Sequence, residues 1–143
     1  MQLTTFLHNG EPRLGLVDGD DLIDLHQLDP KLPTDLRRAL AQGVDFQALA
    51  RLASSAGATR LPLAQQAFAP LISEPGKIVC LGLNYYDHAK EGGRDKPEYP
   101  WLFLRAPSSL MGHGQPALVP RVSERLDYEA ELAVVIGRRV PRH

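Results

Sequence analysis

The sequence predicts an α+β protein, because strand-like and helix-like patterns occupy separate parts of the chain. Short apolar stretches divided by turn dipeptides come first, and apolar residues at irregular helical spacing follow over residues 33–56. From Lys77 onward, compact runs of strand-forming residues surround one short helical segment. The chain has 143 residues, 43% of them hydrophobic, so it is long enough to build a packed core.

The N-terminal part predicts a small antiparallel meander. Three apolar stretches form it, at residues 3–7, 13–17 and 22–25. Asn9-Gly10 and Asp18-Gly19 separate them, and such dipeptides supply the positive φ that tight hairpin turns need. The aspartates at positions 18, 20 and 21 also permit a calcium-loop interpretation. Their spacing lacks the later ligands and the closing glutamate of such a loop, so a hairpin turn is favoured.

Residues 33–56 predict two short helices, interrupted at Gly43, because apolar side chains recur there at irregular helical spacing. These side chains are Leu36, Leu40, Val44, Leu49 and Leu52. Prolines at positions 62, 70 and 75 then mark a linker-like stretch. We place a domain boundary near residue 73, with a small N-terminal domain at 1–73 and a second domain at 74–143.

The second domain is predicted to open with a strand at residues 78–81, a compact run of strand formers. A short helix should follow, with Asn84 as its N-cap and Asp87 in its first turn, where the helix dipole favours a carboxylate. Gly92-Gly93 should end this helix. These glycines and the polar run after them offer little apolar surface, so we expect the segment around His88 to be a lid that becomes ordered only when substrate or product binds.

Composition and charge exclude several classes of protein. Sixteen basic and 17 acidic residues give a net charge of -1, which provides no broad footprint for nucleic acid. The apolar runs are far shorter than the roughly 18 residues of a membrane-spanning helix. The polar start lacks the order of a signal peptide, which predicts a cytoplasmic protein. The lone Cys80 can form no internal disulfide, and we expect a buried structural thiol.

Two further strands are predicted, at residues 101–104 and within residues 126–137. Along the second one, Glu129 and Glu131 would point the same way with Cα atoms roughly 6.6 Å apart, so that both carboxylates can converge on one cation. The opposite face would be apolar, with Tyr128, Ala130, Leu132, Val134 and Ile136. On a helix, residues two apart diverge by about 200° and could not share an ion. The alternative is that both glutamates lie on a solvated sheet face.

His88 and Glu91 are three residues apart on the predicted helix, so they share a face and can form a hydrogen bond. A carboxylate that holds one imidazole nitrogen leaves the other free to take a proton from water, which makes a general base. The alternative is an ordinary surface pair. His113 lies between two glycines in a loop predicted at residues 106–114, and we assign it no role.

Other catalytic signatures are absent from the sequence. It contains no G-x-S-x-G elbow, no phosphate-binding glycine loop ending in Gly-Lys-Ser/Thr and no H-E-x-x-H. Ser108 and Ser109 follow Pro107 without a recognisable base. We interpret them as turn residues or substrate contacts.

The order of these motifs resembles the fumarylacetoacetate hydrolase family. Residues 78–91 resemble the segment that opens the family's catalytic domain, and residues 100–109 resemble the next strand and substrate loop. Residues 126–137 match the family's metal-binding strand closely. Together these motifs cover about sixty residues, and the residues before them resemble, more loosely, the small N-terminal domain of many members.

The resemblance implies a mixed β-sheet fold that rolls around the active site, usually in a homodimer. It implies Glu129 and Glu131 as ligands of Mg²⁺ or Mn²⁺, His88 and Glu91 as the water-activating dyad, and Arg105 as a substrate contact. Members cleave a carbon–carbon bond in acylpyruvates and related 1,3-dicarbonyl acids through a metal-bound enolate, and this is the activity we expect first. Relatives decarboxylate or isomerise 2-oxo acids, which gives a second candidate activity.

The family's third metal ligand, an aspartate, and a later active-site lysine lie downstream of the last motif. The sequence ends at His143, before either residue. We therefore expect a fragment, a split-gene product or an inactive remnant, which acts as a homo-oligomer or with a complementing C-terminal chain. A non-catalytic interaction or metal-binding module is the alternative from another class.

Overall fold

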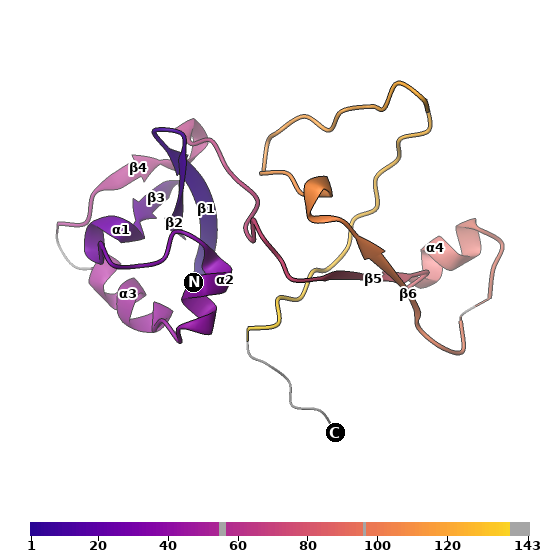
Figure 1. Ribbon diagram of the computed structural model, residues 1–143, viewed down its shortest axis with the longest axis horizontal. Coiled ribbons are helices and arrows are strands. Elements are labelled where there is room, and N and C mark those ends of the chain that lie inside the picture. The colour runs from indigo at the N-terminus through magenta and orange to yellow at the C-terminus, as the bar shows by residue number, and fades with distance from the viewer. Residues whose placement is uncertain (55–56, 96, 138–143) are drawn as a thin grey trace. The chain divides into compact units, whose positions relative to one another are not determined.

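The computed structural model describes residues 1–54, 57–95 and 97–137 (Figure 1). Close contacts divide the chain into two units. The first unit contains Met1–Ser73 and the residues from Met111 onward, and the second contains Glu74–Leu110. The domain boundary near residue 73 stays a prediction.

The first unit contains a four-stranded antiparallel sheet in the order β1-β2-β3-β4. Its strands are β1 (Gln2–His8), β2 (Glu11–Asp18), β3 (Asp21–Asp24) and β4 (Arg60–Pro62). Asn9 and Gly10 have φ values of 54° and 84° in the first hairpin, which is the left-handed conformation that such a turn needs. The predicted meander is therefore confirmed, and β4 extends it by one strand.

The second hairpin, between β2 and β3, is joined to β4 by an arginine. Arg60 donates to Asp18 at 2.6 Å and to Asp21 at 3.2 Å. These hydrogen bonds, first the one to Asp18, raise the pKa of the Arg60 guanidinium. Both carboxylates are thus ion-paired at a hairpin, which agrees with the predicted hairpin turn.

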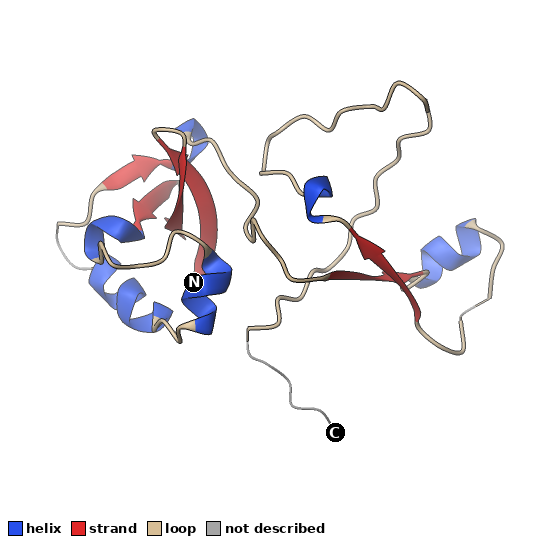
Figure 2. Cartoon of the chain, viewed as in Figure 1, coloured by secondary structure: helices blue, strands red, loops and turns tan. Residues whose placement is uncertain are grey.

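Three helices lie along the sheet of the first unit (Figure 2). They are α1 (Leu25–Leu28), α2 (Leu36–Ala41) and α3 (Phe46–Ala53). Each begins after an aspartate whose side chain accepts a hydrogen bond from a backbone N–H of the first turn, at 2.9 to 3.0 Å. Gly43 has φ +70° between α2 and α3. The two predicted helices are confirmed, and α1 is an additional turn.

The core of this unit lies between the sheet and the helices. The buried side chains that form it are Leu14, Leu16, Ile23, Leu25, Leu32, Leu36, Ala39, Phe46, Leu49 and Ala53. Burial of each large apolar side chain contributes about 1.5–3 kcal/mol, so this cluster is the main stabilising feature of the described chain. Gly15 is also buried, and a Cβ there would come within 2.9 Å of the Leu22 side chain, so close packing requires glycine.

A polar cluster is buried at the junction of β3 and α1. The Asp24 side chain has no exposed surface, and it accepts a hydrogen bond from Nη1 of Arg13 at 2.7 Å. The same carboxylate caps α1 through the backbone N–H of His26. The His26 ring is buried, and neither ring nitrogen has a hydrogen-bond partner among the described residues. Burial lowers the pKa of His26, although the charge of Asp24 acts in the opposite direction.

The second unit contains β5 (Ile78–Gly82), α4 (Tyr86–Glu91), β6 (Trp101–Arg105) and a 3₁₀ turn, η2 (Pro107–Ser109). β5 and β6 pair antiparallel, with Cys80 opposite Phe103. Both predicted strands are confirmed. Cys80 is only half-buried on β5, so the expectation of a buried thiol is wrong: the two-stranded sheet has no second layer over it among the described residues.

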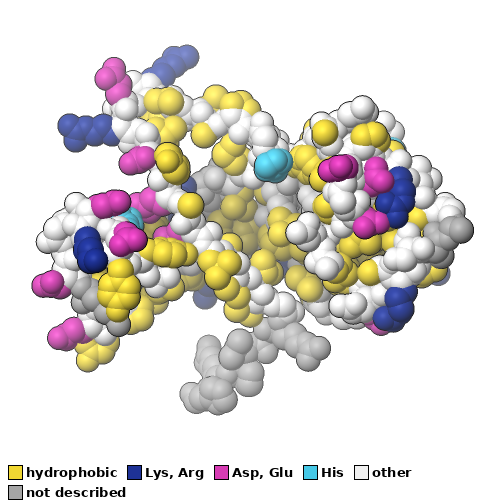
Figure 3. Space-filling model, turned by 180° about the vertical axis from the view of Figure 1, so that it is seen from behind, with side chains coloured by type: hydrophobic (Ala, Val, Ile, Leu, Met, Phe, Trp, Pro, Cys, Tyr) yellow, Lys and Arg dark blue, Asp and Glu magenta, His cyan; other side chains and the backbone are white. Residues whose placement is uncertain are grey.

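Large apolar side chains remain exposed on this small sheet. Leu102 and Leu104 keep 65% and 71% of their surface, and Val79 keeps 54%. Figure 3 shows hydrophobic side chains at the surface of the described chain. A two-stranded ribbon is at best marginally stable by itself, so most of the apolar burial in the described residues belongs to the first unit. Among the described helices, none is long and apolar enough to span a membrane.

Candidate active site

The two residues predicted as a general-base dyad lie one turn apart on α4. His88 is half-buried and Glu91 is exposed. Three residues advance a helix by about 300°, so both side chains leave α4 from the same side. This placement agrees with the predicted pairing, and their catalytic role stays a prediction.

Local hydrogen bonds rather than deep packing hold α4 in place. Tyr85 occupies the N-cap position, although its side chain does not cap the helix, so the expected N-cap at Asn84 is wrong. Leu83 has φ +52°, a left-handed conformation that shifts the helix start past Asn84. Gly92 and Gly93 end the helix as predicted, with Gly93 at φ +62°. Ala89 is the buried side chain of α4.

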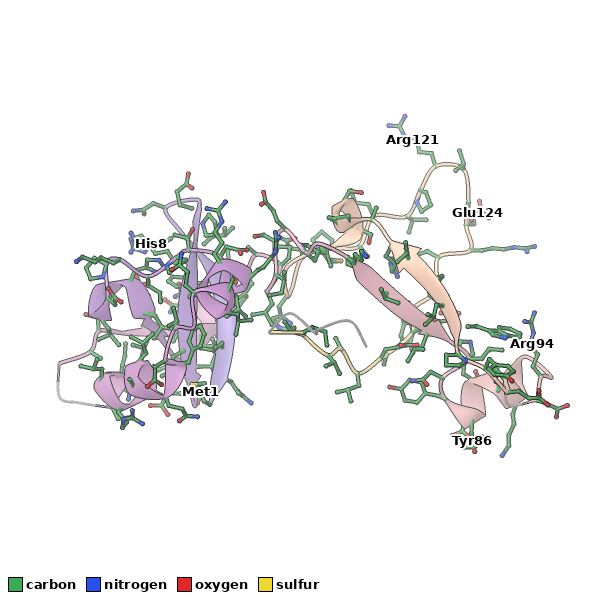
Figure 4. All side chains as sticks on the ribbon, turned by 60° about the horizontal axis from the view of Figure 1, so that its bottom comes forward. Met1, His8, Tyr86, Arg94, Arg121 and Glu124 are labelled. Carbon is green, nitrogen blue, oxygen red and sulfur yellow. The ribbon has the colours of Figure 1, made fainter. Side chains whose placement is uncertain are left out.

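A pocket of about 300 Å³ lies beside α4 within the second unit. Its walls are the end of β5 with the turn after it, Ala89, and residues 97–100. Tyr86 points away from α4 in Figure 4, with 65% of its surface exposed. The Arg94 guanidinium lies 5.7 Å from the centre of the Trp101 ring near the same end of the sheet. Neither His88 nor Glu91 lines this pocket, and its tyrosines, Tyr85, Tyr86 and Tyr99, had been given no role from the sequence.

Arg105 is the last residue of β6, where it pairs with Ile78 and its side chain is exposed. The chain then enters η2, in which the Ser109 hydroxyl donates to the Ala106 carbonyl at 2.8 Å. Ser109 is therefore a turn residue, one of the two roles expected for it. An exposed guanidinium at a strand end lies outside the core and is able to contact a carboxylate, and the contact of Arg105 with substrate stays a prediction.

The expectation of a strand carrying Glu129 and Glu131 is wrong for this structure. Residues 126–137 form neither strand nor helix, and their side chains are exposed. A strand exists only when a neighbour accepts and donates its backbone hydrogen bonds, and the described residues provide no such neighbour here. The Tyr128 backbone N–H instead bonds to the Asp127 carboxylate at 2.8 Å.

Potential metal ligands do not gather into a cluster among the described residues. Over residues 1–54, 57–95 and 97–137, no group of three or more His, Cys, Asp or Glu side chains is placed to hold an ion. A hard divalent cation takes six or more oxygen ligands, and two glutamates on an exposed segment supply too few of them. The assignment of Glu129 and Glu131 as ligands stays a prediction.

Comparisons with known proteins support the family resemblance. The family model described as fumarylacetoacetate hydrolase, C-terminal, matches residues 77–143. The human mitochondrial oxaloacetate tautomerase FAHD2A is 38% identical over 130 residues, which are 90% of this chain and 41% of that protein. The chain thus spans about two fifths of the length of this relative.

Two crystal structures of other proteins are similar to the structure of this chain. One is of a Mycobacterium smegmatis protein described as HpcE, with a TM-score of 0.63 and 28% identity over 84% of this chain and 41% of that one. The other is of maleylpyruvate hydrolase from Sphingobium sp. SYK-6 in complex with manganese(II) and pyruvate, with a TM-score of 0.51 and 29% identity over 76% and 38% of the two chains. This chain belongs to the fumarylacetoacetate hydrolase family. The predicted family and the α+β fold class are therefore confirmed.

Proposed function

We propose that this protein isomerises a small 2-oxo acid, by exchange of the keto and enol forms of an acid resembling oxaloacetate. The observation that carries the proposal is the 38% identity, over 90% of the chain, with a relative named oxaloacetate tautomerase. Hydrolysis of a carbon–carbon bond, which we expected first from the sequence, becomes the second candidate. That relative is described as mitochondrial, whereas we expect a cytoplasmic location for this protein, and this expectation stays a prediction.

A tautomerase needs chiefly one general acid–base group that is positioned to move a proton. In the keto-to-enol direction, a basic nitrogen of His88 would take the proton from the carbon next to the keto group. The electrons of that C–H bond form the C=C bond, the π pair of the C=O bond moves onto the keto oxygen, and this oxygen takes a proton from water to become the enol hydroxyl. A positioned acid–base group contributes typically 100-fold to 10,000-fold to the rate of such a step.

Two other residues would assist His88. Glu91, one turn away on α4, would orient the imidazole ring and stabilise its protonated form. Arg105, exposed at the end of β6, would hold a substrate carboxylate through paired hydrogen bonds. Glu129 and Glu131 remain our candidates for Mg²⁺ or Mn²⁺ ligands, and a bound ion would supply a positive charge for the substrate oxygens.

The hydrolase candidate is supported by the similarity to maleylpyruvate hydrolase in complex with manganese and pyruvate. In that reaction, His88 with Glu91 would take a proton from water, and the hydroxide would add to a carbonyl carbon. The adjacent carbon–carbon bond would then break and release an enolate. A non-catalytic module is the third possibility, and the same assay tests all three.

The test uses freshly dissolved enol-oxaloacetate and, in a parallel reaction, an acylpyruvate, in a buffer that does not bind metals, with and without Mn²⁺. Loss of the enol ultraviolet absorbance reports tautomerisation, and a coupled assay for pyruvate reports decarboxylation of oxaloacetate or hydrolysis of an acylpyruvate. We expect faster loss of the enol without pyruvate. His88→Ala should reduce the rate about 100-fold or more, whereas His8→Ala, on β1, should not. If pyruvate is released in step with substrate loss, the activity is decarboxylation or hydrolysis and not isomerisation. If the protein does not change the rate of substrate loss, the non-catalytic module is favoured.

A further inference from the structure

The two chain segments that bracket the second unit are joined to each other inside the first unit. The chain leaves the first unit after Ser73 and re-enters it at Met111. Before it leaves, residues 67–69 run along β1: the Leu7 N–H donates to the Ala67 carbonyl at 2.8 Å, and the Ala69 N–H donates to the Thr5 carbonyl at 3.0 Å. The outgoing segment is therefore fixed to β1 by an isolated antiparallel bridge between Phe6 and Phe68.

The returning segment is held to this outgoing one by hydrogen bonds of the Gln115 side chain and by a ring contact of His113. Nε2 of Gln115 donates to the Phe68 carbonyl at 3.1 Å, and Oε1 of the same amide accepts from the Gly112 N–H at 2.9 Å. The Gln115 N–H donates to the Gly112 carbonyl at 3.2 Å, which closes the turn. The His113 ring packs edge-on against the Phe68 ring, with 5.7 Å between centroids.

The packing of this turn admits only glycine at its closest point. Gly112 is buried, and a Cβ there would overlap the carbonyl group of Phe68. Gly114 has φ +75°, a conformation that favours glycine. Residues 112–115 together with Phe68 are called the Gln115 latch below. The latch is local in space but joins residues 47 positions apart in the sequence.

We propose that the Gln115 latch closes the excursion of the chain through the second unit, and that Gln115 is a positioning residue for the segment that follows it. That segment, residues 116–137, carries Glu129 and Glu131. Because the latch holds Phe68 and Gln115 together, it reduces the conformational entropy of the chain between them. It also fixes the position at which the following segment starts. The inference goes beyond the proposed reaction and does not depend on it.

The lone cysteine makes a direct test possible. Cys80 lies on β5 in the second unit, and Gln47→Cys on the exposed face of α3 places a second thiol in the first. Spin labels on both thiols of the whole chain report the distribution of distances between them. Hydrogen exchange of the Gly112 amide reports the latch itself. The variants are Gln115→Met, which loses both side-chain hydrogen bonds, and Gln115→Glu, which keeps only the acceptor for Gly112. Gln27→Met, exposed on α1, is the matched control.

We expect Gln115→Met to broaden the distance distribution and to accelerate exchange of the Gly112 amide about 10-fold or more, since the opening of this turn would then be local. Gln115→Glu should broaden the distribution while Gly112 stays protected, which separates the two hydrogen bonds and also carries the test if Gln115→Met fails to fold. Gln27→Met should leave both readouts unchanged. If the distribution of distances between the spin labels is unchanged in both Gln115 variants, the proposed role of the Gln115 latch is wrong, whatever the enzyme assay shows. Because neither readout needs substrate, an inactive protein with the expected shifts would count against the proposed function alone.

Discussion

Nδ1 of His26 lies 3.7 Å from Oδ1 of Asp24, a carboxylate with no exposed surface, yet neither ring nitrogen of His26 has a hydrogen-bond partner among the described residues. Burial lowers the pKa of His26 from its ordinary value of 6.5. The charge of Asp24, the nearby backbone of Leu32 and, least, the charge of Asp29 oppose this effect on the pKa, whereas the charge of Arg13 adds to it. The neutral imidazole is therefore the form that folding favours.

This relationship predicts a loss of stability in mild acid. A lowered pKa in the folded state means that the unfolded chain binds the proton first, so the stability present above pH 6.5 should decline as the pH falls below it, through the folded-state pKa. Urea unfolding between pH 8 and pH 5 measures the decline. In His26→Leu the decline over this window should be smaller. An equally steep decline in that variant would assign the acid sensitivity to other groups.

The buried Asp24 predicts a large cost for loss of its arginine partner. Arg13→Met removes the 2.7 Å hydrogen bond and leaves a carboxylate charge in the core, which costs about 3 kcal/mol in free energy of unfolding. The matched control is Arg51→Met, which removes an exposed ion pair to Asp45 at 3.9 Å and should cost below about 1 kcal/mol. Chemical denaturation gives both values. Similar losses in the two variants would argue that Asp24 gains little from Arg13.

The sparse packing of α4 predicts fast local opening. Its buried side chain is Ala89, whereas α3 buries Phe46, Leu49 and Ala53. Amide hydrogen exchange without ligand should therefore be fast over residues 85–95 and slower over α3 in the same experiment. Addition of a 2-oxo acid should slow exchange around α4 if this segment is the expected lid. Strong protection of α4 in the unliganded protein would contradict the lid.

The exposed glutamates predict weak metal binding by this chain. The described residues contain no three-ligand group, so calorimetric titration with Mn²⁺ should give a dissociation constant weaker than about 0.1 mM. Glu129→Gln and Glu131→Gln should each weaken binding further if these residues are ligands. Glu124→Gln, an exposed glutamate of the same segment (Figure 4), is the control. Equal affinities in all three variants would remove both glutamates from the candidate ligand set.

Elements that depend on neighbouring residues were predictable from the sequence. The hairpin turn at Asn9-Gly10, the helix break at Gly43 and the end of α4 at Gly92-Gly93 all follow from backbone preferences of a few residues. The family resemblance was also predictable, because its motifs are contiguous stretches in a fixed order. The prediction that His88 and Glu91 lie on one face of a helix required only their spacing in the sequence.

Features that depend on distant residues were decided by the tertiary structure alone. Burial of Asp24 beside Arg13, and the junction of Phe68 with Gln115, join positions 11 and 47 residues apart, for which the sequence contains no local signal. The alternation of residues 128–136 predicted a strand, but a side-chain pattern describes only which faces a strand would have. Whether the strand forms depends on a neighbour that satisfies its backbone hydrogen bonds, and the described residues place none beside this segment.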